Sequence, residues 1–166
     1  MISGLLFPRK YKKSIFNINF ADFYKKGYRA VIFDIDNTLA KRYTKKPCKK
    51  TIAFLNGLKT LGFSIALLSN NSRKRVKLFN EELGFVAIHR AGKPGTKGIT
   101  KALNQLGIPK SHSILVGDQI FTDCICGNRC GIYTILVEPI HSAEEWFVRL
   151  KRLPEKLVLG LYKVLK

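Results

Sequence analysis

Acidic residues are scarce in this chain of 166 residues. It holds 11 Asp and Glu residues against 30 Lys and Arg residues, which gives a formal net charge of +19. A field of this sign repels cations and attracts anionic partners such as phosphates, nucleic acid or acidic lipid headgroups. Hydrophobic residues nevertheless make up 46% of the chain and run throughout it, which excludes an intrinsically disordered protein.

Long apolar runs are also lacking. None approaches the roughly 18 residues that a membrane span needs. The apolar stretch 1–8 is very short, and its basic residues follow it, whereas a secretory signal has them first. We therefore predict no transmembrane span and a cytoplasmic location, on the inner face of the membrane if the chain binds lipid.

Cysteine is limited to Cys48, Cys124, Cys126 and Cys130. A chain of this length needs no disulfide staples, and the lack of an export signal favours a reducing compartment. For the last three cysteines we expect core packing, with metal ligation as the alternative.

Short β-rich runs alternate with stretches that suit helices. The predicted strands are 30–33, 63–68, 86–88, 113–116 and 133–137, and the predicted helices are 48–61, 73–83 and 96–106. Continuous apolar strands fit burial on both faces. We therefore predict an α/β fold of three layers, Rossmann-like, with a parallel sheet and helices on both of its faces.

The ends of the chain differ from its centre, although the length predicts one domain. We divide it into a basic and apolar N-terminal extension (1–27), a catalytic core (28–140) and a basic amphipathic C-terminal helical segment (141–166). The last segment places Trp146, Leu150, Leu153, Leu157, Leu161 and Val164 at helical spacing. We expect Pro154 to break or kink that helix.

The apolar stripe of the C-terminal segment has two interpretations. It can dock on the protein's own sheet or on a second subunit, or it can lie on an anionic membrane. The N-terminal patch at residues 5–13 has the same mix of apolar and basic groups, which favours membrane contact.

Polar side chains follow four of the five predicted strands. They are Asp34, Asp36 and Thr38 after the first strand, Ser69 and Asn70 after the second, Lys93 after the third, and Asp118 and Asp123 after the fourth. Ligands of open α/β sheets bind at this carboxyl edge. A cluster of acids repels itself, and a hard cation such as Mg²⁺ would relieve the repulsion. Lysine and hydroxyl groups can hold phosphate oxygens.

Four motifs resemble those of the haloacid dehalogenase superfamily of phosphatases. They are DIDNTL at 34–39, SNN at 69–71, KP at 93–94 and GDQIFTD at 117–123, in the order and at the spacing typical of the superfamily. The stretches LLSNNS, GKPGTKG and GDQIFTDCICGNRCGIYTILVEPI resemble in particular the YqeG-like subfamily of class III enzymes, which is related to phosphatidylglycerophosphate phosphatases. The resemblance covers about residues 28–140.

The resemblance implies catalytic and substrate-binding roles. Asp34 would be the nucleophile that forms an aspartyl-phosphate, and Asp36 would protonate the leaving group and then activate water. Lys93 would neutralise the phosphate and Asp34. The substrate would also be bound by Thr38, Ser69 and Asn70.

The resemblance also implies a Mg²⁺ site. Its ligands would be Asp34, the backbone carbonyl of Asp36, and Asp118. Asp123 would act through a metal-bound water or by orienting Lys93.

The spacing of the motifs leaves no room for a large cap domain. Asp34 lies 35 positions before Ser69, and Ser69 lies 24 positions before Lys93. The predicted helices use most of both intervals. We therefore expect an open site, which suits a large substrate or a lid from an oligomeric neighbour.

These observations lead to a ranked set of functions. The first is a Mg²⁺-dependent phosphomonoester hydrolase whose favoured substrate, suggested by the resemblance alone, is phosphatidylglycerophosphate at a membrane surface. The second is a soluble phosphatase for nucleotides, sugar phosphates or nucleic-acid ends. A basic nucleic-acid or ribosome-binding protein ranks last, because the chain has no recognition motif or stacking platform.

Overall fold

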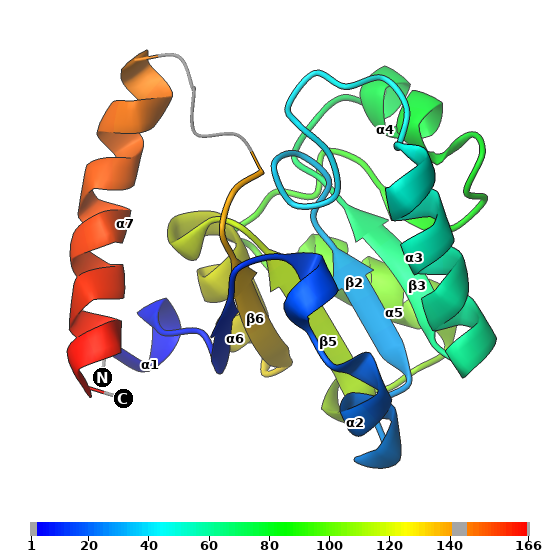
Figure 1. The fold of residues 1–166 in the computed structure, drawn as a ribbon, viewed down its shortest axis with the longest axis horizontal. Helices are drawn as coiled ribbons and strands as arrows, with labels where there is room; N and C mark the ends of the chain where they lie inside the picture. Colours follow the sequence, from blue (N-terminus) through cyan, green and yellow to red (C-terminus); the bar gives the residue numbers. More distant parts are fainter. Residues whose placement is uncertain (1–2, 141–145, 166) are drawn as a thin grey trace.

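A parallel sheet forms the centre of the fold. A computed structural model of the chain describes residues 3–140 and 146–165 (Figure 1). The strands are β1 (Lys10–Lys12), β2 (Ala30–Phe33), β3 (Ser64–Leu68), β4 (Val86–Ile88), β5 (Ser113–Gly117) and β6 (Tyr133–Val137). Their order is β1-β6-β5-β2-β3-β4, and every pair is parallel. The five predicted strands are confirmed to within one residue at each end.

Helices cover both faces of this sheet. One face carries α2 (Phe20–Lys25), α3 (Lys49–Leu61) and α4 (Arg73–Asn80), and the other carries α5 (Lys97–Leu106) and α6 (Ile125–Cys130). Along β2, Val31 and Phe33 pack in the first core with Leu55 of α3, whereas Ile32 packs in the second core with Ile99 of α5. This alternation follows from the period of two in a strand. The three-layer α/β prediction is confirmed.

The helix ends follow local chemistry. The helices α3 and α5 stop at Gly62 and Gly107, which are left-handed. The helix α4 ends three residues before the predicted end. The Asn80 side chain accepts from Phe85 N (3.0 Å) and donates to Phe85 O (2.7 Å), which forms the turn into β4.

The N-terminal segment contributes to the sheet and to the core. Its strand β1 pairs with β6 in the register Tyr11 to Leu136, and we did not predict it because Lys-Tyr-Lys offers a single apolar residue. Between β1 and β2 lie η1 (Ile15–Asn17) and α2, which bury Ile15, Phe20 and Phe23. A short helix, α1 (Ser3–Leu6), precedes β1.

The last helix, α7 (Trp146–Leu165), runs through Pro154 without a break. We expected a break or a kink. The break is wrong, since a proline removes a single backbone N–H and packing of the following turns can hold the helix, and the kink stays a prediction. Residues 141–145 of the predicted C-terminal segment lie outside the described residues. None of the helices in the described part of the chain is long and apolar enough to cross a membrane.

The helix α7 docks through a different face from the predicted stripe. Val158 and Leu159 pack beside Ile120, Cys124 and Leu136, and the Tyr162 ring meets the Phe7 ring edge-on at 5.7 Å. By contrast, the exposed fractions of Leu157, Leu161 and Val164 are 73%, 59% and 83%. The side chains of Trp146, Leu150 and Leu153 lie outside the described part. The interpretation that the stripe docks on the protein's own sheet is therefore wrong for its last three residues.

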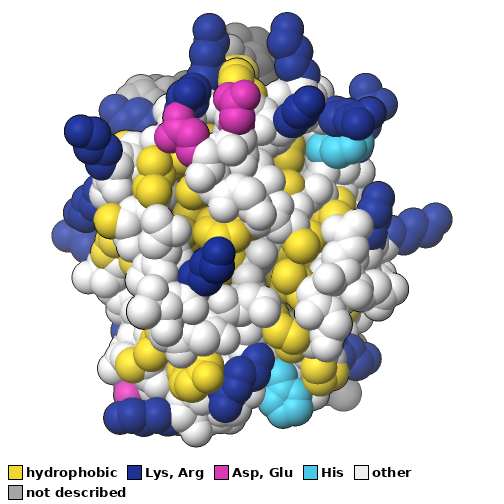
Figure 2. All heavy atoms as spheres, turned by 90° about the vertical axis from the view of Figure 1, so that its right-hand side faces the viewer, with side chains coloured by type: hydrophobic (Ala, Val, Ile, Leu, Met, Phe, Trp, Pro, Cys, Tyr) yellow, Lys and Arg dark blue, Asp and Glu magenta, His cyan; other side chains and the backbone are white. Residues whose placement is uncertain are grey.

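No large cap interrupts the fold in the described ranges. The connection from β2 to α3 is a loop, and α4 is the sole helix between β3 and β4. Lys and Arg side chains are spread over the surface, with few acidic side chains among them on the face that Figure 2 shows. The strand ends therefore lie under no large cap domain in the described part of a strongly basic molecule.

Candidate active site

The carboxyl edge of the sheet brings the predicted site residues together. The strands β5, β2 and β3 are neighbours, so Asp118, Asp34 and Ser69, each one residue beyond a strand, end side by side. Asp34 N donates to Val116 O (2.9 Å), which continues the β2–β5 pairing to the base of the site. All three side chains are buried. The crossover connections of the fold thus bring together three segments that are far apart in the sequence.

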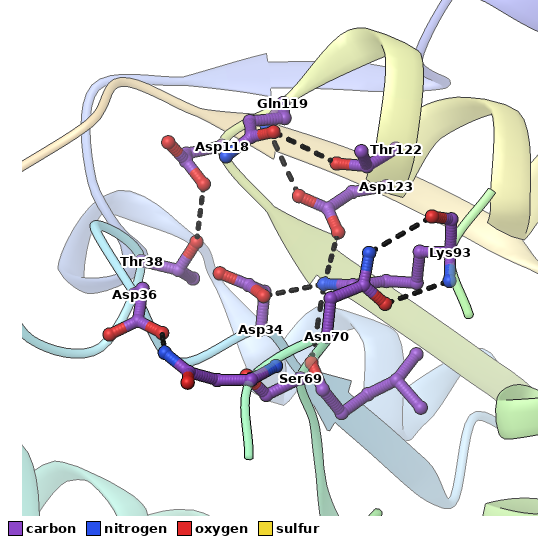
Figure 3. A network of polar contacts seen from close by, with 12 residues as sticks. Asp34, Asp36, Thr38, Ser69, Asn70, Lys93, Asp118, Gln119, Thr122 and Asp123 are labelled. Atoms are coloured by element: carbon purple, nitrogen blue, oxygen red, sulfur yellow. Dashed lines mark hydrogen bonds and ion pairs between the residues drawn. The ribbon is translucent and has the colours of Figure 1, made fainter. Parts of the chain in front are cut away.

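Lys93 lies at the centre of the site. Its Nζ donates to Asp34 Oδ1, to Asp123 Oδ1 (2.7 Å) and to the carbonyl of Leu68 (3.2 Å), as Figure 3 shows. Burial alone would lower the pKa of this lysine, but the carboxylates of Asp123 and Asp34 together outweigh burial and raise it. Lys93 is therefore a permanent cation at the end of the sheet.

The backbone of Lys93 is fixed by Asn70. The Asn70 amide accepts from Lys93 N (2.8 Å) and donates to Lys93 O (2.9 Å). We predicted Asn70 as a substrate ligand. Because both ends of its amide bond the loop that carries Lys93, the geometry favours a role in positioning that loop.

A π-helical turn, η3 (Ile120–Cys124), positions Asp123. Its Oδ2 accepts from Gln119 N (3.1 Å) while its Oδ1 accepts from Lys93. A Cβ on Gly117 would collide with the Asp123 carboxyl, so this close approach requires glycine. The motif at 117–123 therefore holds Asp123 against Lys93, which supports the predicted role of orienting that lysine.

The nucleophile candidate Asp34 has an unusual environment. Burial raises the pKa of its carboxyl to about 7, the Lys93 ammonium opposes this shift, and Asp123 and Asp36 add to it. A bound cation would restore the ionised form, since a nearby positive charge favours the carboxylate.

Three aspartates of the site form a group that suits a hard cation. Oxygens of Asp34, Asp118 and Asp123 lie within 4.8 Å of one another, and all three residues are buried. Thr38 Oγ1 donates to Asp118 Oδ1 at 3.4 Å. An oxygen-only set of donors that is rich in carboxylates is the kind that Mg²⁺ prefers. This buried group of three aspartates is therefore compatible with the predicted metal.

Asp36 is held by two residues that we did not assign to the site. Arg75 Nη2 donates to Asp36 Oδ1 (3.0 Å), and Asn71 Nδ2 donates to Asp36 Oδ2 (3.3 Å). Arg75 belongs to the basic run 73–77, where nothing in the sequence separates it from surface cations. Asn71 lies within the SNN motif at 69–71, so the sequence motif could have identified it as a site residue.

Two of the predicted core cysteines lie close to this site without belonging to its candidate metal group. Cys124 and Cys126 are buried, and Cys126 Sγ donates to Gly95 O at 3.0 Å. Within residues 3–140 and 146–165 the candidate metal group consists of the three aspartates alone. Core packing therefore describes Cys124 and Cys126, as expected.

Comparison with known proteins agrees with the motifs. A profile of the family described as haloacid dehalogenase-like hydrolase matches residues 40–137. The chain is 32% identical over 163 residues to the probable phosphatase YqeG of Bacillus subtilis (strain 168), which covers 98% of this chain and 95% of that protein. It is 34% identical over 152 residues to phosphatidylglycerophosphate phosphatase 1, chloroplastic/mitochondrial, of Arabidopsis thaliana, covering 84% of this chain and 42% of the plant protein.

The fold is also found in solved structures. A putative haloacid dehalogenase-like hydrolase from Bacteroides fragilis matches with a TM-score of 0.58 at 17% identity, covering 73% of this chain and 93% of that chain. A protein from Listeria monocytogenes serotype 4b matches with a TM-score of 0.54 at 22% identity, covering 79% and 97%. The chain therefore belongs to the haloacid dehalogenase-like hydrolase family and is a phosphatase of that family.

Proposed function

We propose that this phosphatase is a Mg²⁺-dependent phosphomonoester hydrolase that works through an aspartyl-phosphate on Asp34. The observation that carries this proposal is the buried Lys93 ammonium, which bonds Asp34 and Asp123 at the carboxyl edge of the sheet. It provides a fixed positive charge beside a carboxylate that can attack phosphorus. Such preorganised charge is worth most where water is excluded.

In the first half-reaction, a carboxylate oxygen of Asp34 bonds to phosphorus as the bond from phosphorus to the leaving oxygen breaks. Asp36 donates a proton to that oxygen, which leaves as an alcohol. The Lys93 ammonium balances the charge on the phosphoryl oxygens, and the hydroxyls of Thr38 and Ser69 donate to them.

In the second half-reaction, Asp36 accepts a proton from a water molecule whose oxygen bonds to phosphorus. The bond from phosphorus to Asp34 breaks, which releases inorganic phosphate and regenerates the carboxylate. Asp36 therefore returns to its protonated form for the next substrate. When bound by Asp34, Asp118 and the Asp36 carbonyl, Mg²⁺ would supply further positive charge next to the phosphoryl oxygens.

The variant Asp34→Asn tests this chemistry. We expect it to abolish Mg²⁺-dependent phosphate release from p-nitrophenyl phosphate, because the amide is a poor nucleophile and a poor ligand. The control is Asp22→Asn, which makes the same change at an exposed position on α2, near the other end of the sheet. Unchanged phosphate release by Asp34→Asn would refute the mechanism.

For the substrate we propose phosphatidylglycerophosphate. The support is the similarity to the plant protein of that name and the absence of a large cap in the described chain, which leaves room for a bulky lipid. A phosphate-release screen with lipid, nucleotide, sugar and oligonucleotide phosphates tests this choice. We expect the lipid to have the highest kcat/KM; a preference for a soluble substrate would replace the lipid proposal.

We further propose that α7 contacts an anionic membrane from the inner, cytoplasmic side. The exposed Leu157, Leu161 and Val164 form an outward-facing apolar strip, with exposed Lys156 and Lys163 beside it. Basic residues at an anionic surface contribute about 1 kcal/mol each. The N-terminal patch supports this less than we expected, because its Leu6 and Tyr11 pack towards α7 inside the protein.

Vesicle flotation tests the membrane contact. We expect the protein to float with phosphatidylglycerol vesicles, and the triple variant Leu157→Ser, Leu161→Ser, Val164→Ser to float far less. Leu61→Ser, at the end of α3, changes an exposed leucine elsewhere and serves as the control. If the triple variant floats as well as the wild type, or changes the oligomeric state instead, the strip does not bind lipid.

A further inference from the structure

The carboxylate of Asp36 is fixed from one side of the site by a single segment. Arg75 Nη2 lies 3.0 Å from Oδ1, and Asn71 Nδ2 lies 3.3 Å from Oδ2. Both donors come from the chain that follows β3 and enters α4. Each carboxylate oxygen has about two acceptor sites, so one donor on each still leaves a site for the proton that Asp36 must carry.

Arg75 differs from an arginine that stabilises structure. Arg29 of the same chain donates through Nη1 to the carbonyls of Tyr24 (2.8 Å) and Tyr28 (2.7 Å). Arg75 has Nε and Nη1 buried, and neither atom has a hydrogen-bond partner in the described part of the chain. Burying donors without acceptors costs free energy. Burial of the Arg75 guanidinium is therefore unfavourable in itself, and among the described residues its hydrogen bond is the one from Nη2 to Asp36.

The position of Arg75 is set by the helix that carries it. Ser72 caps α4 by accepting from Arg75 N at 3.4 Å. The guanidinium lies 5.2 Å from the ring centre of Phe79, which is fully buried one turn further on. The side chain of Arg75 is 12% exposed, and that of Asp36 is 19% exposed. Because its guanidinium is nearly buried and packs on the Phe79 ring, Arg75 can hold the Asp36 carboxylate in one orientation.

We infer that Arg75 is a positioning residue, which holds the Asp36 carboxylate in the orientation from which it protonates the leaving oxygen. This inference rests on the proposed role of Asp36. It gives Arg75 no contact with the substrate. It also predicts that the loss on changing Arg75 depends on how much the leaving group needs a proton.

Two aryl phosphates give that readout. p-Nitrophenolate leaves without a proton, whereas phenolate from phenyl phosphate is more basic and needs one. The measured quantity is kcat/KM, which reports the steps up to departure of the leaving group and is not affected by breakdown of the aspartyl-phosphate. General acid catalysis contributes about 10²–10⁴-fold.

We expect Arg75→Met to lower kcat/KM for phenyl phosphate on the order of tenfold more than for p-nitrophenyl phosphate. Asp36→Asn should show the same bias with a larger ratio, and Arg75→Lys should recover part of the loss. Lys77→Met removes one positive charge from an exposed position of the same helix and should show no bias. Thermal unfolding with and without Mg²⁺ confirms that each variant is folded.

The outcomes separate the two ideas. If Asp36→Asn shows the bias and Arg75→Met lowers kcat/KM for both substrates equally, or for neither, the inference about Arg75 is overturned and the proposed function stands. If Asp36→Asn shows no bias, the acid role of Asp36 fails, and the role of Arg75 fails with it.

Discussion

At the scale of single residues, the position of Asp123 depends on Gly117. A methyl group at Gly117 would collide with the Asp123 carboxyl, which bonds the Lys93 ammonium. We expect Gly117→Ala to lower kcat/KM about 100-fold, because displacing a catalytic group by about 1 Å can cost that much.

The control for this prediction is Gly57→Ala in α3, where a Cβ would meet nothing within 4 Å. That change should leave activity intact and stabilise the helix by about 0.5–1 kcal/mol. Steady-state kinetics and thermal unfolding of both variants check the pair. Full activity in Gly117→Ala would show that Asp123 need not approach the strand end so closely.

The raised pKa of the Asp34 carboxyl makes metal binding depend on pH. Because burial raises the pKa of its carboxyl to about 7, the group is protonated below pH 7 and ionised above it. A proton and a Mg²⁺ ion compete for the same oxygens. We therefore expect Mg²⁺ to raise Tm more at pH 8 than at pH 6.

The raised pKa of Asp34 also makes the stability of the metal-free protein depend on pH. A carboxyl whose pKa is higher in the folded state stabilises that state below its unfolded pKa of about 4, and this contribution is lost as pH rises through about 7. Asp34→Asn should remove both effects. Scanning fluorimetry of the two proteins checks this, and an equal Mg²⁺-induced rise of Tm at both pH values would contradict the assignment.

Only some of the residues in the site could be predicted from the sequence. Asp34 and Asp118 each follow a buried strand, and Lys93 follows the partly buried edge strand β4, so their meeting at the carboxyl edge was predictable once a parallel sheet was predicted. The contact of Arg75 with Asp36 was not predictable, because it depends on which face of α4 turns towards the loop after β2. Asn70 carried a motif signal, but its bond to the Lys93 backbone depends on loop geometry that the motif does not encode.

At the scale of elements, the docked face of α7 makes a stability prediction. Tyr162 is 8% exposed and packs on Phe7, whereas Leu161 beside it is 59% exposed. We expect Tyr162→Ala to lower the free energy of unfolding by about 2 kcal/mol, since it removes buried aromatic packing at the rim of the core.

Leu161→Ala should change the free energy of unfolding by less than about 0.5 kcal/mol, as is usual for exposed positions. Urea unfolding of the two variants measures the difference. Equal losses would mean that α7 does not dock through the Tyr162 face.

The hydrophobic pattern of the sequence predicts some of the strands and helices correctly and misses others. The buried strand Ala30–Phe33 is apolar at every position and was found without error. The edge strand Lys10–Lys12 has one neighbour and little apolar content, so its register comes from β6 and not from its own sequence. In α7 we identified one apolar stripe from its spacing, and we missed the second apolar face, with Val158, Leu159 and Tyr162, which meets the protein.

At the scale of the whole molecule, the charge of +19 should act on substrate capture. Surface lysines and arginines attract a phosphate ester over distances comparable to the Debye length, which is about 10 Å at 0.1 M salt and about 3 Å at 1 M. We expect kcat/KM for a phosphate monoester to fall several-fold as NaCl is raised from about 0.02 to 0.5 M.

The kcat value at saturating substrate should change little over the same salt range, because Lys93 and Asp34 are buried from the solvent. Kinetics in NaCl series at constant Mg²⁺ provide the measurement. A kcat/KM that does not change with salt would show that the net charge serves another partner.

The proposed mechanism requires that Asp34 becomes phosphorylated, and mass spectrometry can detect that phosphoryl group. The variant Asp36→Asn is mixed with p-nitrophenyl phosphate and Mg²⁺, quenched in acid, digested and analysed by mass spectrometry. The p-nitrophenolate leaving group needs no proton, whereas breakdown of the aspartyl-phosphate needs the base that the variant lacks. We therefore expect one phosphoryl group on the peptide that contains Asp34. A phosphoryl group on another residue, or p-nitrophenol release with no phosphorylated peptide, would contradict it.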